Sequence, residues 1–439
     1  METAKRTGLR VGMLAYTEYL TDPRVRREAQ ALAERGDQVD FLCLRQPGTN
    51  AASRWQDVDG VHVCHLPFKK YQGANQIAYL LSYILFLFIS AFWLTGLHFR
   101  RRYQVIQVHT MPDFLIFAAL VPRIFGCKLI LDMHDLTSDL YSVKFRSKLL
   151  RPLVWGLRLQ ERLSAGLAHH VVTVHEPYRQ VLIQRGIKPQ KISVLMNAPD
   201  DRIFSMAVRE TGKLPSSAAS GAPSFTLVYH GTIVARYGLD VMLRAVALLR
   251  ERDVDSGSSS VPNLRLVVYG KGDDLPRLLA LRSELGLEDV TYFHGKHVPL
   301  EQLPGLLIQA DLAVVPNLSN PFTDYVLPTK LMEYAAIGVP AVVARTPVVS
   351  QYFDDEMVAY FTPGDAHDLA RHIDALAHDP ARRRALARNA HQRFTQRYNW
   401  TAIKQGYYAL VDSLCRTGHA PVTPDLPAAS FTTGKEASA

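Results

Sequence analysis

Cysteine is scarce in this chain of 439 residues. Cys43, Cys64, Cys127 and Cys415 are its four cysteines, and no two of them form a C-x-x-C pair. This spacing excludes a disulfide-rich scaffold and a zinc ribbon, and it favours a reducing cytosol. The polar first ten residues lead directly into an apolar run, so we expect no secretory signal there.

Two common nucleotide-binding motifs are also missing. No G-x-G-x-x-G follows the first predicted strand, where residues 15–19 read AYTEY, and no Walker A motif occurs anywhere. Nicotinamide or flavin binding in that mode and P-loop chemistry are therefore disfavoured. Residues 57–59 and 253–255 match a metal-binding D-x-D pattern, but this spacing is common and both copies lie in loop-like sequence. We therefore expect no metal ion.

Acidic residues are outnumbered by basic ones. The chain has 41 Asp and Glu against 50 Lys and Arg, for a formal net charge of +9. Such an excess favours anionic partners such as phosphates or an acidic membrane surface. The basic residues are spread along the chain without an interleaved aromatic motif, so we expect no nucleic-acid partner.

Continuous apolar runs alternate with helical patterns along most of the chain. This alternation predicts an α/β fold with two Rossmann-like domains, each a mainly parallel sheet flanked by helices. A Gly-, Pro- and Ser-rich stretch at 212–224 separates the two halves. The predicted strands are Leu9–Ala15, Gln38–Leu44, Val61–Leu66, Gln104–His109, Cys127–Asp132, His170–Val174, Ile192–Met196, Thr226–His230, Leu264–Tyr269, Val290–His294, Leu312–Val315, Ala341–Ala344 and Val358–Phe361. The predicted parts are an N-terminal domain over 1–205, a linker over 206–224, a C-terminal domain over 225–400, a helix over 401–416 that packs back on the first domain, and a disordered tail over 417–439.

One long apolar run, residues 77–97, contains no charge and has basic residues on both sides. Its length allows a membrane span, but spanning would separate residues 9–66 from the strands they should pair with. A helix buried in the first domain and a helix lying in the membrane surface are the alternatives. Residues 144–162 mix basic residues with Leu, Val and Trp, which fits either surface binding or a solvated basic helix.

The strongest cluster of candidate site residues is DYVLPTKLMEYAAIGVP at residues 324–340. Pro328 and Thr329 open a predicted helix, whose free amides form an anion site. Lys330 adds a cation that suits a diphosphate. Glu333 shares its helix face, and a carboxylate there can accept two hydrogen bonds from a vicinal diol such as ribose. The alternative is an ordinary exposed Lys–Glu pair.

Other candidates follow predicted strands, where doubly wound sheets bind their ligands. Gly231 would let a ligand approach the backbone, and Arg236 could neutralise phosphate. In the first half, His109 ends one predicted strand and His134 follows another. His134 could orient a substrate hydroxyl, and Asp135 could hold it or accept that hydroxyl's proton. A purely structural role for the histidines is the alternative.

These motifs resemble glycosyltransferase family 4, whose members are retaining enzymes of the GT-B fold, with two facing Rossmann-like domains. The resemblance is carried by residues 327–334 (LPTKLMEY) with 338–340 (GVP), and by residues 230–240 (HGTIVARYGLD). Residues 111–113, 131–135 and 196–200 resemble bacterial members that build exopolysaccharide or O-antigen. The resemblance implies a metal-independent hexosyltransferase without a cofactor. Its co-substrate would be a nucleotide diphosphate sugar, bound by the C-terminal domain over 225–400. The acceptor would be a hydroxyl of a lipid-linked molecule or polysaccharide, bound by the N-terminal domain over 1–205.

The same resemblance implies that Glu333 binds the donor ribose while basic residues hold the diphosphate. Where the family often has another Glu that reaches the donor sugar, this chain has Tyr325, with Asp324 beside it. The usual Arg and Lys of the preceding loop fall on Thr232 and Tyr237. The predicted catalytic residues are His134, Arg236, Lys330 and Glu333. The predicted donor-binding residues are Gly231, Thr232, Arg236, Asp324, Tyr325, Pro328, Thr329, Lys330 and Glu333, and the predicted acceptor-binding residues are Asp22, Arg24, His109 and Asp135.

The basic and apolar first domain suits a lipid-linked acceptor and an anionic membrane surface. We therefore predict a cytoplasmic enzyme that is peripherally associated with the inner membrane. Two alternatives from other classes stay open. One is a nucleotide-sugar epimerase, and the other is a non-enzymatic, membrane-associated nucleotide-sugar-binding protein, which the absence of the usual Glu at Tyr325 favours.

Overall fold

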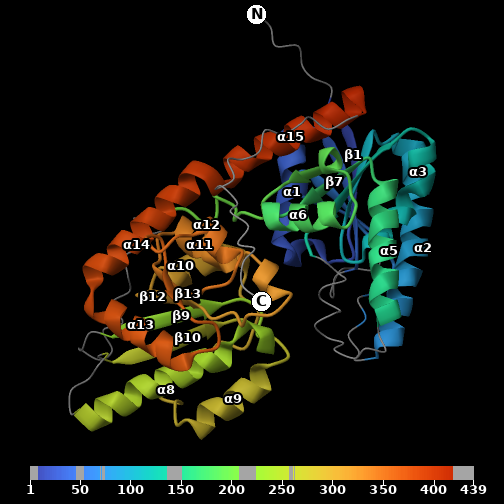
Figure 1. Ribbon diagram of the computed structural model, residues 1–439. Helices are drawn as coiled ribbons and strands as arrows, with labels where there is room; N and C mark the ends of the chain where they lie inside the picture. The colour runs from blue at the N-terminus through green and yellow to red at the C-terminus, as the bar shows by residue number, and fades with distance from the viewer. Residues whose placement is uncertain are drawn as a thin grey trace, which may run out of the picture. The chain divides into compact units, whose positions relative to one another are not determined.

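The computed structural model describes residues 8–45, 54–69, 71, 75–135, 151–206, 224–256, 261 and 263–418. Its contacts divide the chain into two compact units, each built on one sheet with flanking helices (Figure 1). Unit 1 comprises Met1–Asn197 and Ile403–Ala439, and unit 2 comprises Ala198–Ala402. The predicted linker 206–224 and the predicted tail 417–439 lie almost entirely outside the described residues.

Unit 1 contains an eight-stranded sheet with the strand order β3-β4-β2-β1-β5-β6-β7-β8. All neighbours pair in parallel except β3 and β4, which are antiparallel. The strands are β1 (Arg10–Leu14), β2 (Gln38–Cys43), β3 (Trp55–Val58), β4 (Val61–His65), β5 (Val105–His109), β6 (Lys128–Met133), β7 (His170–Thr173) and β8 (Ile192–Val194). The helices are η1 (Tyr19–Thr21), α1 (Pro23–Glu34), α2 (Gln76–Arg101), η2 (Asp113–Ala119), α3 (Leu120–Ile124), α5 (Arg151–Leu167), α6 (Glu176–Gln184), η4 (Pro189–Lys191) and α15 (Trp400–Thr417), whose first three residues belong to unit 2.

Unit 2 contains a six-stranded, fully parallel sheet with the order β11-β10-β9-β12-β13-β14. The strands are β9 (Phe225–His230), β10 (Leu264–Tyr269), β11 (Thr291–Phe293), β12 (Leu312–Val315), β13 (Ala341–Ala344) and β14 (Ala359–Phe361). The helices are η5 (Ala235–Tyr237), α8 (Leu239–Ser256), α9 (Leu275–Glu284), η6 (Leu300–Gln302), α10 (Leu303–Leu307), η7 (Thr323–Tyr325), α11 (Thr329–Ala336), α12 (Val349–Tyr352), α13 (Ala366–His378), α14 (Pro380–Arg393) and η8 (Phe394–Tyr398).

These two sheets confirm the predicted fold class. Every predicted strand is present, and three of them have the predicted bounds: Leu264–Tyr269, Leu312–Val315 and Ala341–Ala344. The prediction works because central parallel strands are buried on both faces and read as continuous apolar runs. It missed β3, a short strand at the sheet edge whose residues Gln56 and Asp57 are exposed.

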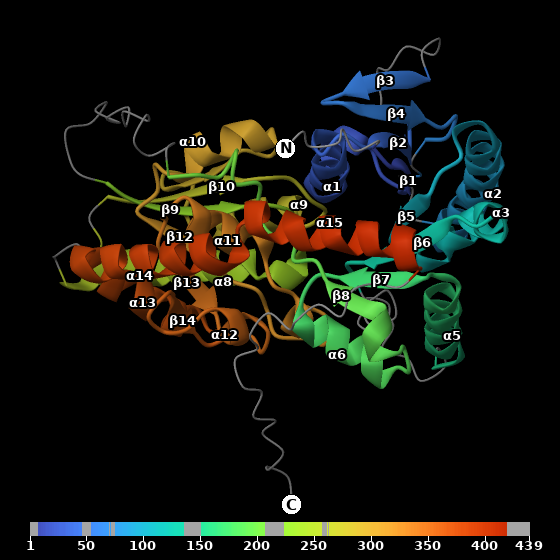
Figure 2. The same cartoon turned by 90° about the horizontal axis from the view of Figure 1, so that it is seen from above.

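The long apolar run forms α2, which connects two strands of the same sheet (Figure 2). Before α2, β4 pairs with β2, and after it β5 pairs with β1, which is itself the parallel neighbour of β2. By length and composition alone α2 could cross a membrane. Its connections, however, make it a crossover between β4 and β5, two strands of one sheet that are separated by β2 and β1.

Helix α15 packs on unit 1 through polar contacts. Tyr407 donates a hydrogen bond to Gln107 Oε1 at 2.5 Å, and both residues are buried. Tyr408 donates to the Ala31 carbonyl at 2.8 Å. A nitrogen of Arg35 lies 3.1 Å from a carboxylate oxygen of Asp412. The C-terminal helix is therefore tied to the N-terminal sheet.

Tyr407→Phe is expected to lower the free energy of unfolding by about 1–3 kcal/mol, because the buried Gln107 oxygen loses its donor. Tyr408→Phe is the matched control. The Ala31 carbonyl keeps the Arg35 amide as a donor in that variant, so its loss should be smaller. Urea unfolding of both variants measures the difference, and equal losses would show that the Tyr407 hydroxyl has no special role.

Candidate active site

In unit 2 the strand order reverses beside β9. From β9 the chain adds β10 and β11 on one side of the sheet and then returns to place β12 on the other. In open parallel sheets ligands bind at such a point, beyond the carboxyl ends of the strands. The segments that follow β9 and β12, the latter ending in the first turns of α11, carry the predicted donor-binding residues, at 231–236 and 324–333.

Lys330, near the start of α11, is buried against the end of β9, with 8% of its surface exposed. Its Nζ donates a hydrogen bond to the Tyr229 hydroxyl at 2.6 Å, and it lies 3.9 Å from the centre of that ring and 4.8 Å from the ring of Tyr237. Burial lowers the pKa of Lys330 to about 7, although Glu333 acts in the opposite direction. Lys330 is therefore not part of an ordinary exposed pair, and a bound anion would favour its charged form.

Glu333 lies one turn further along α11 and hydrogen-bonds through Oε2 to His230, the last residue of β9. The hydroxyl of Tyr334 lies 2.9 Å from Nδ1 of His230 and accepts a hydrogen bond from the His230 amide at 3.2 Å. The imidazole is thus held between Glu333 and Tyr334. Among the described residues Oε1 of Glu333 accepts no hydrogen bond, which leaves this atom for a ligand hydroxyl.

Two glycines bring the loops after β9 and β10 together. Gly231 has a φ of 121°, and a Cβ at this residue would lie 3.3 Å from both Cε and Nζ of Lys330. Gly270 has a φ of 147°, and a Cβ there would lie 1.9 Å from the Gly231 carbonyl oxygen. Both positions therefore require glycine, and the Gly270 fragment serves backbone packing.

Gly231→Ala is expected to weaken nucleoside diphosphate binding about tenfold or more, ~1.4 kcal/mol, because the new methyl group strains the backbone and displaces Lys330. Gly286→Ala is the control. Gly286 also has a positive φ of 63°, but a Cβ there meets nothing within 4 Å, so only stability should change. Calorimetric titration with nucleoside diphosphates compares the two, and unchanged affinity in Gly231→Ala would show that this backbone position is not part of the site.

Arg236 joins the same cluster through aromatic rings. Its guanidinium carbon lies 5.1 Å from the centre of the Tyr237 ring and 5.2 Å from that of Phe322. Its buried Nε has no hydrogen-bond partner among the described residues. The structure therefore places this cation beside the loop after β12, where an anionic ligand would satisfy it.

The other predicted donor-binding residues lie around this cluster. The carboxylate of Asp324 accepts a hydrogen bond from the Ser319 hydroxyl at 2.8 Å, and Tyr325 is 38% exposed. Pro328 precedes α11, of which Thr329 is the exposed first residue. The Thr232 carbonyl accepts a hydrogen bond from Tyr229 at 2.9 Å, which links it to Lys330 through that hydroxyl.

Unit 1 has a buried charged cluster where β1, β5 and β6 end. Arg24 holds Asp132 with two hydrogen bonds, Nε to Oδ2 at 3.1 Å and Nη2 to Oδ1 at 2.5 Å. Nδ1 of His109 lies 2.8 Å from Oδ2 of Asp132, and Nδ1 of His134 lies 3.9 Å from the same oxygen. Glu28 lies 3.4 Å from Arg24. The cluster therefore gathers both predicted histidines around one carboxylate.

Burial and neighbouring charges shift the pKa values of the residues in this cluster. Burial alone would raise the pKa of Asp132, but Arg24 and the two histidines hold it well below its ordinary value. Burial would lower the pKa of His134, yet the Asp132 carboxylate raises it on balance. Burial, together with Asp132, raises the pKa of Glu28. Nε2 of His109 is buried without a hydrogen-bond partner among the described residues.

Glu28, His109 and Asp132 bring ligand atoms within 4.8 Å of one another, a spacing that could hold a metal ion. The Arg24 guanidinium already lies against two of the three residues. A divalent ion there would face a like charge, so the cluster fits the guanidinium as its cation. In the D-x-D at 57–59, the first carboxylate pairs with His62 and the second lies 3.1 Å from Arg26.

The remaining acceptor-binding predictions lie at the edge of this cluster. Asp22 caps α1, where its carboxylate accepts a hydrogen bond from the Val25 amide at 3.5 Å. Asp135 is half-buried directly after His134. The sequence prediction did not assign roles to Glu28, Asp132, Tyr229 and His230. A signal was available for Glu28, an acid inside the apolar stripe of α1, and for Asp132, an acid in an apolar run.

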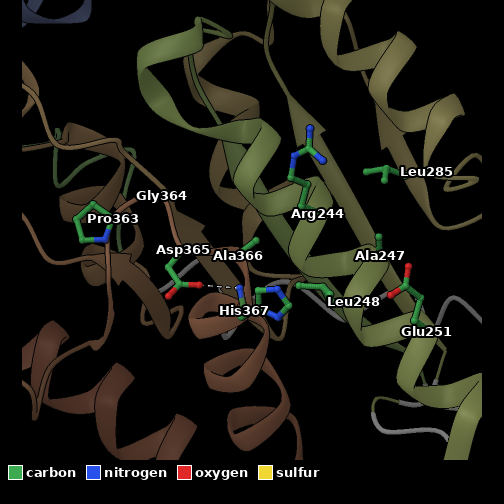
Figure 3. Close-up of a pocket in the computed structure, with 10 residues that line it drawn as sticks. All are labelled: Arg244, Ala247, Leu248, Glu251, Leu285, Pro363, Gly364, Asp365, Ala366 and His367. Atoms are coloured by element: carbon green, nitrogen blue, oxygen red, sulfur yellow. Dashed lines mark hydrogen bonds between the residues drawn. The ribbon is translucent and has the colours of Figure 1, made fainter.

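A hollow of about 720 Å³ opens elsewhere on unit 2, between α8 and α13 (Figure 3). Arg244 and Glu251 of α8 line one side, and Asp365 and His367 line the other. The Asp365 carboxylate accepts a hydrogen bond from the His367 amide at 2.9 Å and so caps α13. None of the predicted site residues lines this hollow, and Asp365 serves the helix end.

Comparison with known proteins matches each half of the chain to a glycosyltransferase family. Residues 21–198 match the model of the Glycosyl transferase 4-like domain, and residues 214–393 match that of Glycosyl transferases group 1. The chitobiosyldiphosphodolichol beta-mannosyltransferase of Candida glabrata is 23% identical over 411 residues, which are 87% of each chain.

Solved glycosyltransferases share the fold. Sucrose-phosphate synthase from Thermosynechococcus elongatus has a TM-score of 0.72 at 18% identity, covering 92% of this chain and 99% of that one. Anabaena HepE, solved in complex with UDP and glucose, has a TM-score of 0.66 at 16% identity, covering 92% and 100%. The two family matches do not overlap and together cover most of the chain, so this chain is a glycosyltransferase of the GT-B fold, with a 4-like domain followed by a group 1 domain.

Proposed function

We propose that this glycosyltransferase moves a hexosyl group from a nucleotide diphosphate sugar to a hydroxyl of a lipid-linked or polysaccharide acceptor, with retention and without a metal ion or cofactor. The observation that carries the proposal is the pair Lys330 and Glu333 at the switch point of unit 2. A buried cation beside helix amides suits a diphosphate, and a carboxylate one turn away suits a ribose diol. The structural similarity to a protein solved with UDP and glucose supports it.

In this reaction the leaving group is the part that most needs stabilisation. Negative charge grows on the nucleoside diphosphate as its bond to the sugar breaks. Lys330, Arg236 and the first amides of α11 would stabilise this charge, which is the kind of interaction that contributes most to such reactions. We propose that the acceptor attacks from the face that the diphosphate leaves, which gives retention.

Unit 1 would hold the acceptor. His134 is kept basic by Asp132 and would orient the acceptor hydroxyl, while Asp135 accepts its proton. The Candida glabrata relative is named for a diphosphodolichol-linked acceptor, which supports a lipid-linked acceptor here. We propose a role in building cell-envelope polysaccharide of the exopolysaccharide or O-antigen type, at the cytoplasmic surface of the inner membrane.

Turnover of a donor panel tests this proposal. UDP-, GDP-, ADP- and dTDP-sugars are incubated with lipid-linked acceptors, with and without EDTA, and nucleoside diphosphate release is measured. We expect release with one donor class, insensitivity to EDTA, and a product whose NMR spectrum shows the anomeric configuration of the donor. An isomerised sugar nucleotide without release would indicate an epimerase, and binding without turnover would indicate a binding protein. Either result would contradict the proposal.

A further inference from the structure

Helix α2 has an apolar face that unit 1 does not cover. Phe88 and Phe92 are 67% and 78% exposed, and Leu81 is 58% exposed on the same face. The opposite face, which includes Phe86 and Leu94, is buried in the core of unit 1. The helix is therefore packed along one side and apolar along the other, where a helix at a water surface would be polar.

Helices α3 and α5 extend this face. Ile124 and Phe125 at the end of α3 are 71% and 62% exposed, and the Phe125 ring lies 5.0 Å from that of Phe99 in α2. On α5, Trp155 and Leu163 are 68% and 56% exposed. Both α2 and α5 contact η2, and both views show α2, α3 and α5 along the same side of unit 1 (Figures 1 and 2). An apolar patch of this extent marks an interaction surface.

The charges around this patch are almost all positive. Its flanks carry the basic residues Arg100, Arg102, Arg123, Arg158 and Arg162. The sequences of α2, α3 and α5 contain a single carboxylate, Glu161. That residue is buried and pairs with Arg185 at 2.8 Å. The patch is therefore complementary to a surface that is both apolar and anionic, as a bilayer with acidic headgroups is.

We infer that α2, α3 and α5 form a membrane-docking face that lies in the plane of an anionic bilayer. Spanning by α2 is incompatible with the sheet, because both of its flanking strands lie in that sheet on the same side of any membrane. The aromatic and aliphatic side chains of α2 and α3 would enter the interface, and the arginines of α5 would meet the headgroups. This inference deepens the proposed membrane association, and its test involves no sugar transfer, so the two can fail separately.

Vesicle flotation tests the apolar part. We expect the full-length protein to float with vesicles of phosphatidylcholine and phosphatidylglycerol and to float less with phosphatidylcholine alone. Phe88→Ser with Phe92→Ser should weaken binding about tenfold or more, because two rings no longer leave water. Tyr292→Ser, which removes a ring 56% exposed on β11 of unit 2, should leave binding unchanged. Unchanged thermal unfolding of each variant shows that the fold is kept.

Charge reversal tests the electrostatic part. Arg158→Glu with Arg162→Glu should reduce flotation with the anionic vesicles and its dependence on salt. The matched control is Arg384→Glu with Arg388→Glu, an exposed pair with the same four-residue spacing on α14. Failure of the wild-type protein to float, equal loss in the two charge-reversed pairs, or a stable dimer that the Phe88 and Phe92 substitutions dissociate without affecting flotation would overturn the inference.

Discussion

Replacing Lys330 with methionine is expected to lower kcat/KM for the sugar donor by about 10²–10³, because removing one preorganised group that stabilises the leaving oxyanion has this effect. Lys330 meets this description better than any surface lysine, since it is buried against the rings of Tyr229 in β9 and Tyr237 in η5. Lys296→Met, at an exposed position of the same unit, is the control and should be near wild type. Steady-state kinetics measure both, and equal activities would contradict the role of Lys330.

The lowered pKa of Lys330 provides a second test of its role in donor binding. In the free protein burial lowers this pKa to about 7, and a bound diphosphate should raise it. Donor binding above pH 7 should therefore take up a proton, and affinity should fall as pH rises through the raised pKa of the complex. Calorimetry in two buffers of different ionisation enthalpy measures the uptake. In Lys330→Met the uptake should disappear.

Asp132→Asn is expected to lower the free energy of unfolding by about 3–5 kcal/mol, because it removes the partner of a buried cation. Asp132 is fully buried, and its loss would leave Arg24 with Glu28, 3.4 Å away, and the more weakly interacting Asp22 as acidic neighbours. Asp59→Asn is the control. It breaks an ion pair with Arg26 in which Asp59 is 54% exposed, and such pairs contribute about 1 kcal/mol or less.

The pH dependence of this effect follows from the direction of the Asp132 shift. Its pKa in the folded protein lies well below the ordinary value, so its stabilising contribution is present above the unfolded pKa and is lost as pH falls through the folded pKa. The stability difference between wild type and Asp132→Asn should be constant above about pH 5 and should shrink below about pH 4. A difference that does not change with pH would contradict the buried ion pair.

The fold was largely predictable because its strands are continuous apolar runs. Much of the candidate site was predictable for a related reason, since Lys330, Glu333 and Arg236 follow strands or open a helix at a strand end. The burial of Lys330 was not, because it depends on rings that β9 and η5 bring to it from about a hundred residues away. The link between His230 and Glu333 was missed for the same reason.

The environment of the apolar helix α2 could not be predicted from the sequence. Its composition fits a spanning, a buried and an interfacial helix equally well, and hydropathy alone does not separate them. Strand pairing on either side of α2 excludes the first, and the exposure of Phe88 and Phe92 excludes full burial. The pairing of strands that are distant in sequence therefore excludes a spanning α2, which the local sequence alone could not do.

Equilibrium binding of nucleoside diphosphates tests the central claim most directly. UDP, GDP and ADP are titrated calorimetrically into the wild-type protein, Glu333→Gln, Lys330→Met and the control Lys296→Met. We predict that wild type and Lys296→Met bind one of the three with the same affinity, and that Glu333→Gln and Lys330→Met each bind it at least about tenfold more weakly, ~1.4 kcal/mol. Equal affinity in all four proteins, or no binding by wild type, would contradict a donor site at Lys330 and Glu333.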